Sequence, residues 1–256
     1  MYKEYAVFAK DLAFSAGKEI LPFFRKQITI EDKLDTSPVT FADKNAEKIM
    51  RRMIKEKYPQ HGIVGEEYGI ENENAEFVWV LDPIDGTKSF ITGSPLFGTL
   101  VALLHNQVPV VGVIYQPFSK ECWCGIKGYK SVYNGKIIKT RQCQFVEKAS
   151  LFSTADRLMF KNKKDLSSFE KLNQNVYVSR FSADCYAYGL LSMGCADIIC
   201  EADMKLYDYA ALIPIVEGAG GGIFNWKGEC LSVHGDGHIL ALGDKILLPK
   251  VIELLS

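Results

Sequence analysis

The sequence lacks a long hydrophobic run, and it lacks an excess of charge of either sign. No apolar stretch approaches the roughly 18 residues that a membrane span needs. The 30 basic residues are balanced by 31 acidic ones, which leaves a net charge of −1. Nucleic acids and anionic membrane surfaces attract proteins through clustered positive charge. We therefore expect neither a nucleic acid nor a membrane among the partners of this protein.

Signals for secretion and for disulfide cross-linking are also missing. Acidic residues at Glu4, Asp11 and Glu19 interrupt the first segment, so it does not fit a signal peptide. The seven cysteines are odd in number and include no C-x-x-C pair. We interpret them as free thiols of a cytoplasmic protein. Cys122 and Cys124 form a C-x-C pair without partners at zinc spacing, which favours strand packing over a metal site.

The 256 residues are 48% hydrophobic, which is enough for one large core. We expect a single domain over 1–256, with an N-terminal half of about 1–145 and a C-terminal half of about 146–256. Periodicity predicts helices at 2–24, 41–57, 184–193, 206–217 and from 245 onward, and a surface loop from 156 that enters a helix before 171. Strands are predicted at 77–81, 97–104, 108–115, 121–128, 129–140, 176–181, 196–201, 222–226 and 238–242. This order of elements indicates a layered α/β fold.

The hexapeptide D-P-I-D-G-T at 82–87 combines two carboxylates with turn-forming residues, directly after an apolar run. We expect a buried strand to end at Asp82, because Pro83 has no N–H to donate to the ladder. Carboxylates at a strand end suit Mg²⁺, which prefers oxygen ligands. Backbone N–H groups at the start of a following helix suit a phosphate. The turn therefore predicts a combined site for a metal and a phosphate.

Taken singly, these features have ordinary explanations. D-P-x-D-G-T is also the composition of a plain turn. The adjacent acids Glu66 and Glu67 fit a solvated loop, and Asp208 fits a helix cap. Asp43 fits a capping box that begins at Thr40. Their occurrence together in one chain favours the metal site.

The G-E-E at 65–67, the D-P-I-D-G-T at 82–87 and the Y-D-Y-A-A at 207–211 together resemble the inositol monophosphatase family. The resemblance extends from about residue 33 to residue 243. It implies an αβαβα layered sandwich, a homodimer, and a magnesium-dependent enzyme that hydrolyses a small phosphate monoester.

The resemblance also implies a role for each matching position. Two or three Mg²⁺ ions would bind to Glu66, Asp82, Asp85, Asp208 and the main-chain carbonyl of Ile84. The catalytic residues would be Asp43 and Thr87, which activate the attacking water, together with Glu66. The phosphate would be bound by Asp85, Gly86 and Thr87. The rest of the substrate would be bound by Asp184, Glu201 and Asp208.

Three segments resemble the histidinol-phosphatase branch of the family: 88–100, 184–191 and 205–209. Histidinol phosphate carries a cationic amine and an imidazole, whereas a polyol phosphate carries neither. Asp184 and Glu201 would present negative charge to such a substrate. A helix cap is the alternative role of Asp184. Leu206, where that branch has proline, departs from the pattern.

Three functional hypotheses follow from these observations. The first is a histidinol-phosphatase of histidine biosynthesis. The second is an inositol-1-monophosphatase or a broad sugar-phosphate phosphatase. The third is a non-catalytic regulatory protein on the same fold, which is disfavoured because every expected metal ligand is present.

Overall fold

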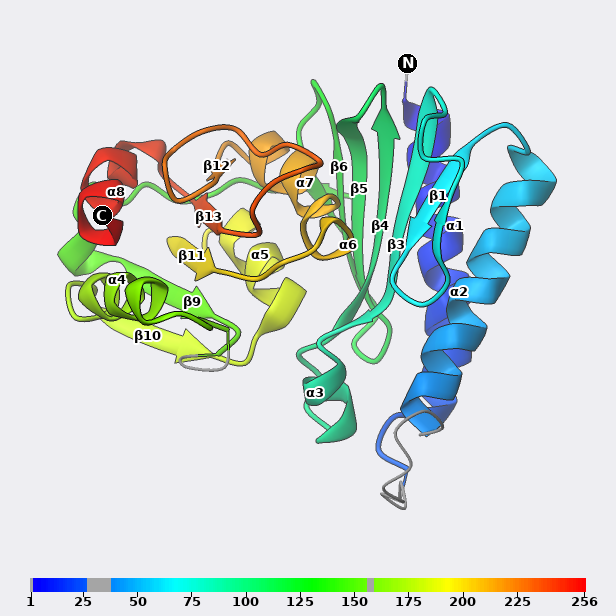
Figure 1. Cartoon of the computed structure of the whole chain (residues 1–256), viewed down its shortest axis with the longest axis horizontal. Coiled ribbons are helices and arrows are strands. Elements are labelled where there is room, and N and C mark those ends of the chain that lie inside the picture. Colours follow the sequence, from blue (N-terminus) through cyan, green and yellow to red (C-terminus); the bar gives the residue numbers. More distant parts are fainter. Residues whose placement is uncertain (1, 27–37, 156–158) are drawn as a thin grey trace.

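Two β-sheets alternate with three layers of helices in the computed structural model, which describes residues 2–26, 38–155 and 159–256 (Figure 1). The outer face of the larger sheet is covered by α1 (Lys3–Ile20) and α2 (Pro38–Lys57). Between the two sheets lie α5 (Asp184–Ser192), α6 (Leu206–Tyr209) and α7 (Leu212–Gly218). The outer face of the smaller sheet is covered by α4 (Lys163–Asn173) and α8 (Leu248–Leu255). The predicted α/β fold with an αβαβα sandwich is confirmed.

The larger sheet has eight strands in the order β2-β1-β3-β4-β5-β6-β7-β8. Their bounds are β1 (Gly62–Gly65), β2 (Gly69–Glu71), β3 (Phe77–Asp85), β4 (Gly98–His105), β5 (Val108–Gln116), β6 (Glu121–Ile126), β7 (Val132–Tyr133) and β8 (Lys136–Ile137). β1 and β3 are parallel, and the other neighbours are antiparallel. The short helix α3 (Thr87–Ile91) follows β3 at the end of the sheet.

The smaller sheet has five strands in the order β10-β9-β11-β13-β12. Their bounds are β9 (Ser150–Ser153), β10 (Val178–Phe181), β11 (Ile198–Glu201), β12 (Gly222–Phe224) and β13 (Ile239–Leu242). β9 lies between β10 and β11 and is parallel to both. Three apolar clusters match the layers. Two lie under the outer helices of each sheet, and the third surrounds the middle helices and contacts both sheets.

Several predicted elements differ from the observed ones. α2 begins at Pro38, so Thr40 lies inside the helix and the prediction that it caps the helix is wrong. β3 continues through Pro83, which interrupts the pairing register without ending the strand. The predicted strand at 129–140 is reduced to β7 and β8 on either side of the Asn134-Gly135 turn. The predicted helix at 206–217 is divided into α6 and α7. The short strands β1, β2 and β9 were not predicted.

Two other expectations, for the cysteines and for the helix that follows the loop from 156, agree with the structure. Cys122 and Cys124 lie buried in β6, and all seven cysteines are free thiols. Over the described ranges, no helix is both long and apolar enough to cross a membrane. The loop predicted from 156 begins with three residues outside the described part of the chain. It leads into α4 as expected.

Close packing between the larger sheet and the middle helices depends on Gly112 in β5. A Cβ atom at this position would lie 1.9 Å from the carbonyl oxygen of Ala211 and 2.9 Å from Cγ of Pro214. The backbone that joins α6 to α7 therefore rests directly on the strand. Because α6 carries Asp208, this contact also sets the distance between Asp208 and the larger sheet.

We predict that Gly112→Ala will lower the free energy of unfolding by about 1–3 kcal/mol, because the added methyl group overpacks a backbone contact. Urea unfolding followed by circular dichroism measures the change. Gly235→Ala is the matched control. Its Cβ would lie 3.4 Å from the nearest atom, so we expect a change within about 0.5 kcal/mol. Equal stability of the two variants would contradict the packing role of Gly112.

Candidate active site

β3 ends in an irregular stretch that brings two carboxylates together. Asp82 pairs with Leu100 and Asp85 pairs with Gly98, so β3 has one more residue than β4 in this interval. In a regular strand, side chains three residues apart point to opposite faces. The extra residue changes this alternation, as β-bulges do. Pro83 fits the bulge because it has no N–H to pair, and its carbonyl accepts a 2.8 Å hydrogen bond from Thr99 Oγ1.

Three carboxylates from two distant segments meet at this strand end. Asp82, Asp85 and Asp208 each place one oxygen within 4.8 Å of the others. The Asp85 Oδ2 atom accepts a hydrogen bond of 2.7 Å from the N–H of Cys185. The Asp208 Oδ2 atom accepts one of 2.6 Å from the N–H of Lys205. These bonds orient both carboxylates without neutralising their charge.

Further predicted site residues come from three other segments. Glu66 directly follows β1, whose last residue, Gly65, pairs with Leu81 of β3, and the Glu66 and Asp82 carboxyl groups affect each other's pKa. Asp43 of α2 is buried, and the backbone of Ile84 lies near enough to its carboxyl group to oppose part of the rise in its pKa. Thr87 begins α3 and donates from Oγ1 to the Ile84 carbonyl at 3.1 Å. All the side chains predicted for the metal and the attacking water are therefore neighbours, and their roles remain predictions.

Burial and mutual repulsion dominate the electrostatics of this cluster. Burial, followed by repulsion from Glu66, raises the pKa of Asp43 from 3.8 to about 8. Burial also raises the pKa of Asp208 to about 7 and holds the pKa values of Asp82 and Asp85 well above their usual range. The Oδ1 atoms of Asp43 and Asp82 are buried and have no hydrogen-bond partner among the described residues.

The donor set fits a divalent cation. Crowded carboxylates, with two unpartnered buried oxygens, offer the hard oxygen ligands and the negative charge that Mg²⁺ requires. Burying the Asp82 carboxylate as an anion would be costly without a cation to balance its charge. A bound cation would therefore relieve a repulsion that the fold itself creates.

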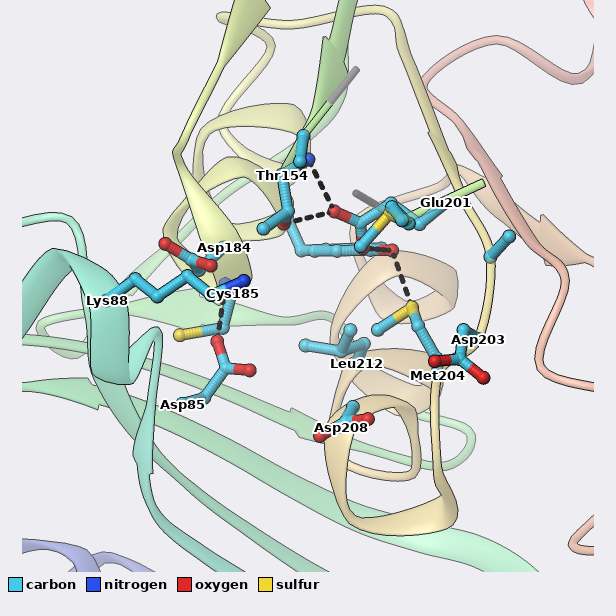
Figure 2. Close-up of a pocket in the computed structure, with 14 residues that line it drawn as sticks. Asp85, Lys88, Thr154, Asp184, Cys185, Glu201, Asp203, Met204, Asp208 and Leu212 are labelled. Carbon is cyan, nitrogen blue, oxygen red and sulfur yellow. Dashed lines mark hydrogen bonds between the residues drawn. The ribbon is translucent and has the colours of Figure 1, made fainter. Parts of the chain in front are cut away.

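A cavity of about 240 Å³ opens beside the acidic cluster (Figure 2). Asp85 and Asp208 lie on one side of it, and Asp184 and Glu201 lie on its wall toward the smaller sheet. The other lining residues are Lys88, Thr154, Ala155, Met159, Cys185, Tyr188, Ala202, Asp203, Met204 and Leu212. All three residues predicted for the substrate therefore border this cavity: Asp184, Glu201 and Asp208, the last of which also belongs to the acidic cluster.

Asp184 does not act as a helix cap. It is the first residue of α5, and the N-cap position belongs to Ala183, which has no side-chain capping bond. Its Oδ2 atom accepts a 2.7 Å hydrogen bond from Ser89 Oγ in α3. A Cβ atom at Gly86 would lie 3.0 Å from this carboxylate, so Asp184 stands directly against the turn that is predicted to bind phosphate.

Glu201 lies at the end of β11 and is fully enclosed. It accepts hydrogen bonds from Thr154 Oγ1 at 2.5 Å, from Thr154 N at 3.0 Å and from Tyr188 OH at 2.7 Å. Burial raises the pKa of Glu201 to about 7. Sequence reasoning missed Ser89, Thr154 and Tyr188. Of these, only Tyr188 carried a signal, because it follows Asp184 by one helical turn.

The model of the inositol monophosphatase family matches residues 1–256. The chain belongs to the inositol monophosphatase family. Its members are metal-dependent phosphoric monoester hydrolases, generally with Mg²⁺, and the acidic cluster agrees with this chemistry. The predictions of family and enzyme class are confirmed.

The chain has histidinol-phosphatases as well as inositol monophosphatases among its relatives. It is 41% identical to "Bifunctional phosphatase IMPL2, chloroplastic" of Arabidopsis thaliana, over 98% of this chain and 75% of that protein. It is 34% identical to a histidinol-phosphatase of Chlorobaculum parvum, over 91% of this chain and 90% of that protein. Among solved structures, an inositol monophosphatase from Zymomonas mobilis matches with a TM-score of 0.94 and 40% identity, over 100% of this chain and 98% of that one.

The raised pKa of Asp43 predicts how pH affects the metal-free protein. Between pH 4 and 8, the folded state keeps a proton on this carboxyl group that the unfolded chain loses, so stability falls as pH rises. Mg²⁺ at the cluster would bind the deprotonated carboxylates and oppose this loss. We therefore expect added Mg²⁺ to raise the melting temperature more at pH 8 than at pH 6.

Differential scanning calorimetry, with and without Mg²⁺, measures this difference. Asp43→Asn is the control, because an amide does not titrate in this range. We expect the variant to show a smaller decline in metal-free stability with pH. An equal Mg²⁺ effect at both pH values would contradict the linkage between metal and protons.

Proposed function

We propose that the protein hydrolyses L-histidinol phosphate to L-histidinol and phosphate, a reaction of histidine biosynthesis. The observation that carries this proposal is the acidic wall of the cavity beyond the metal cluster. Asp184 and Glu201 lie on this wall, together with Asp203. A substrate with a cationic amine and an imidazole complements the charge of such a wall. The polyol part of a polyol phosphate is uncharged, so it gains no electrostatic attraction from the wall.

In this proposal, the carboxylates of Glu66, Asp82, Asp85 and Asp208 and the carbonyl of Ile84 would hold two or three Mg²⁺ ions. When bound, they lower the pKa of water and balance the negative charge that develops on the phosphoryl group. The orienting bonds to Asp85 and Asp208 keep these carboxylates available to metal on their remaining oxygens.

The protein's own groups align the nucleophile and the phosphate. Thr87 donates to the Ile84 carbonyl, and Asp43 lies near the same residue; together they would orient the attacking water and accept its proton. The N–H groups of Gly86 and Thr87 stand at the first turn of α3, where backbone donors have no intrahelical partner. They would bind the phosphate oxygens, with Asp85 beside them.

A second candidate is an inositol-1-monophosphatase or a broader sugar-phosphate phosphatase. It is favoured by the 40% identity to the Zymomonas mobilis inositol monophosphatase over the full chain. Glu201 fits both candidates, because a carboxylate bonded to Thr154 and Tyr188 can also accept hydrogen bonds from sugar hydroxyls. Asp184 is therefore the residue that distinguishes the two candidate functions. The cytoplasmic location and the homodimer remain predictions from the sequence.

We predict that phosphate release will be much faster from L-histidinol phosphate than from inositol 1-phosphate at equal concentrations. Asp184→Asn keeps the shape of the side chain and removes its charge. We expect this variant to lower kcat/KM for histidinol phosphate by about 10-fold or more and to leave inositol 1-phosphate nearly unchanged. A phosphate-release assay on both esters measures this change of preference.

Asp203→Asn is the matched control on the same wall. Its carboxylate already forms ion pairs with Lys161 and Lys205, so its charge is largely offset, and we expect a smaller effect. Comparable rates on the two esters in the native protein would reject histidinol phosphate as the specific substrate. An unchanged preference in Asp184→Asn would reject Asp184 as its determinant.

We further predict that Asp85→Asn will abolish turnover, with a loss of at least about 1,000-fold, because an amide cannot supply the anionic metal ligand. Circular dichroism should show an intact fold, because the amide oxygen can still accept the hydrogen bond from Cys185. Appreciable residual activity at saturating Mg²⁺ would contradict the proposed ligand set.

A further inference from the structure

Glu47 is a buried acid of α2 that the reaction itself does not use. It lies one helical turn after Asp43 and one turn before Arg51, so the three side chains share one face of the helix. Glu47 has no exposed surface. A buried carboxylate is costly unless hydrogen bonds and a counter-charge satisfy it. Its partners therefore indicate what this charge does.

Two of the partners are backbone N–H groups in the turn that carries Glu66. The Oε2 atom of Glu47 accepts from Glu67 N at 2.8 Å, and the Oε1 atom accepts from Tyr68 N at 3.2 Å. Glu66 itself donates its N–H to the Leu81 carbonyl at 3.2 Å. The backbone on both sides of the Glu66 side chain is thus bound, on one side to β3 and on the other to α2.

Arg51 completes the arrangement. Its Nε atom donates to Glu47 Oε1 at 2.7 Å, and Nη2 donates to the carbonyl of Gly69 in β2. Nη1 also lies 3.6 Å from Glu71 Oε2. The pair Glu47–Arg51 therefore attaches both the turn and the following strand to α2.

Gly65 leaves the space that the Glu47 carboxylate occupies. A Cβ atom at Gly65 would lie 2.1 Å from Glu47 Oε1 and 2.8 Å from Oε2. Glycine is therefore required here by space, because the carboxylate occupies the position of a side chain. The first residue of the G-E-E motif and Glu47 thus depend on each other, although they are 18 residues apart.

We propose that Glu47 is a positioning residue for the metal site, and that it fixes Glu66 by holding the turn at 66–68. Glu47 touches neither the substrate nor the metal in this scheme, and it acts only through Glu66. The inference rests on the proposed role of Glu66 as a metal ligand. It does not depend on which phosphate ester is the substrate.

Glu47→Gln tests the proposal, because the amide keeps the side-chain volume but has a single acceptor oxygen. In the native protein, the donors from Arg51, Glu67 and Tyr68 use both carboxylate oxygens. We expect Mg²⁺ binding to the substrate-free protein, measured by isothermal titration calorimetry, to weaken roughly 10- to 100-fold, the usual effect of losing a residue that orients a metal ligand. At saturating Mg²⁺, kcat should return close to the native value, with KM for the ester unchanged.

Asp197→Asn is the matched control for lost stability. Asp197 is equally buried and accepts hydrogen bonds from Arg141, Ser150 N and Ser150 Oγ, but it directly precedes β11 of the smaller sheet. We expect it to destabilise the fold without changing the Mg²⁺ affinity. Equal weakening in both variants would mean that general destabilisation is the cause, and it would overturn the proposal. Native affinity in Glu47→Gln would overturn it as well.

Two further measurements keep the test decisive. In the native, metal-free protein, the amides of Glu67 and Tyr68 should be protected from hydrogen exchange, and this measurement needs no variant. Free exchange at both amides would show that Glu47 does not hold the turn. Glu66→Gln should itself weaken Mg²⁺ binding. If it does not, the ligand role of Glu66 fails, and the positioning role of Glu47 fails with it, while the substrate assays remain valid.

Discussion

Mutual repulsion among buried carboxylates is the constraint on which the rest of this structure depends. Asp43, Asp82, Asp85 and Asp208 are brought to one sheet edge, where burial and like charge raise the pKa of each. A fold does not gain stability from such a cluster. The layers must therefore hold the carboxylates together against repulsion until a cation balances them, as the metal dependence of the family requires.

The fold holds the carboxylates together because the backbone beside each of them is fixed by contacts with other elements. The bulge of β3 turns Asp82 and Asp85 toward each other. Gly112 lets the backbone next to α6 rest on the larger sheet, which brings Asp208 near β3. Parallel pairing of β1 with β3 delivers Glu66 to the same edge. Each contact joins segments that are far apart in the sequence.

The cavity lies between the acidic cluster and the smaller sheet, so its lining comes from both halves of the chain. Asp184 stands against Gly86, next to the turn that would bind the phosphate. Glu201 and Thr154 form the far wall, at the ends of β11 and β9. In the proposed function, the sheet edge would therefore carry the hydrolysis, whereas α5 and the smaller sheet would carry the recognition of the rest of the substrate.

By itself, the sequence determined the family, the chemistry of the D-P-I-D-G-T turn and most of the long helices and strands. These depend on contiguous residues and on periodicity, which are local properties. Only the tertiary structure decided the bonds of Asp184 to Ser89, of Glu201 to Thr154 and of Glu47 to the Glu66 turn. It also decided the short strands β1, β2 and β9, which are too brief to show a period. Such contacts depend on how distant elements pack, and that information is absent from any single stretch of residues.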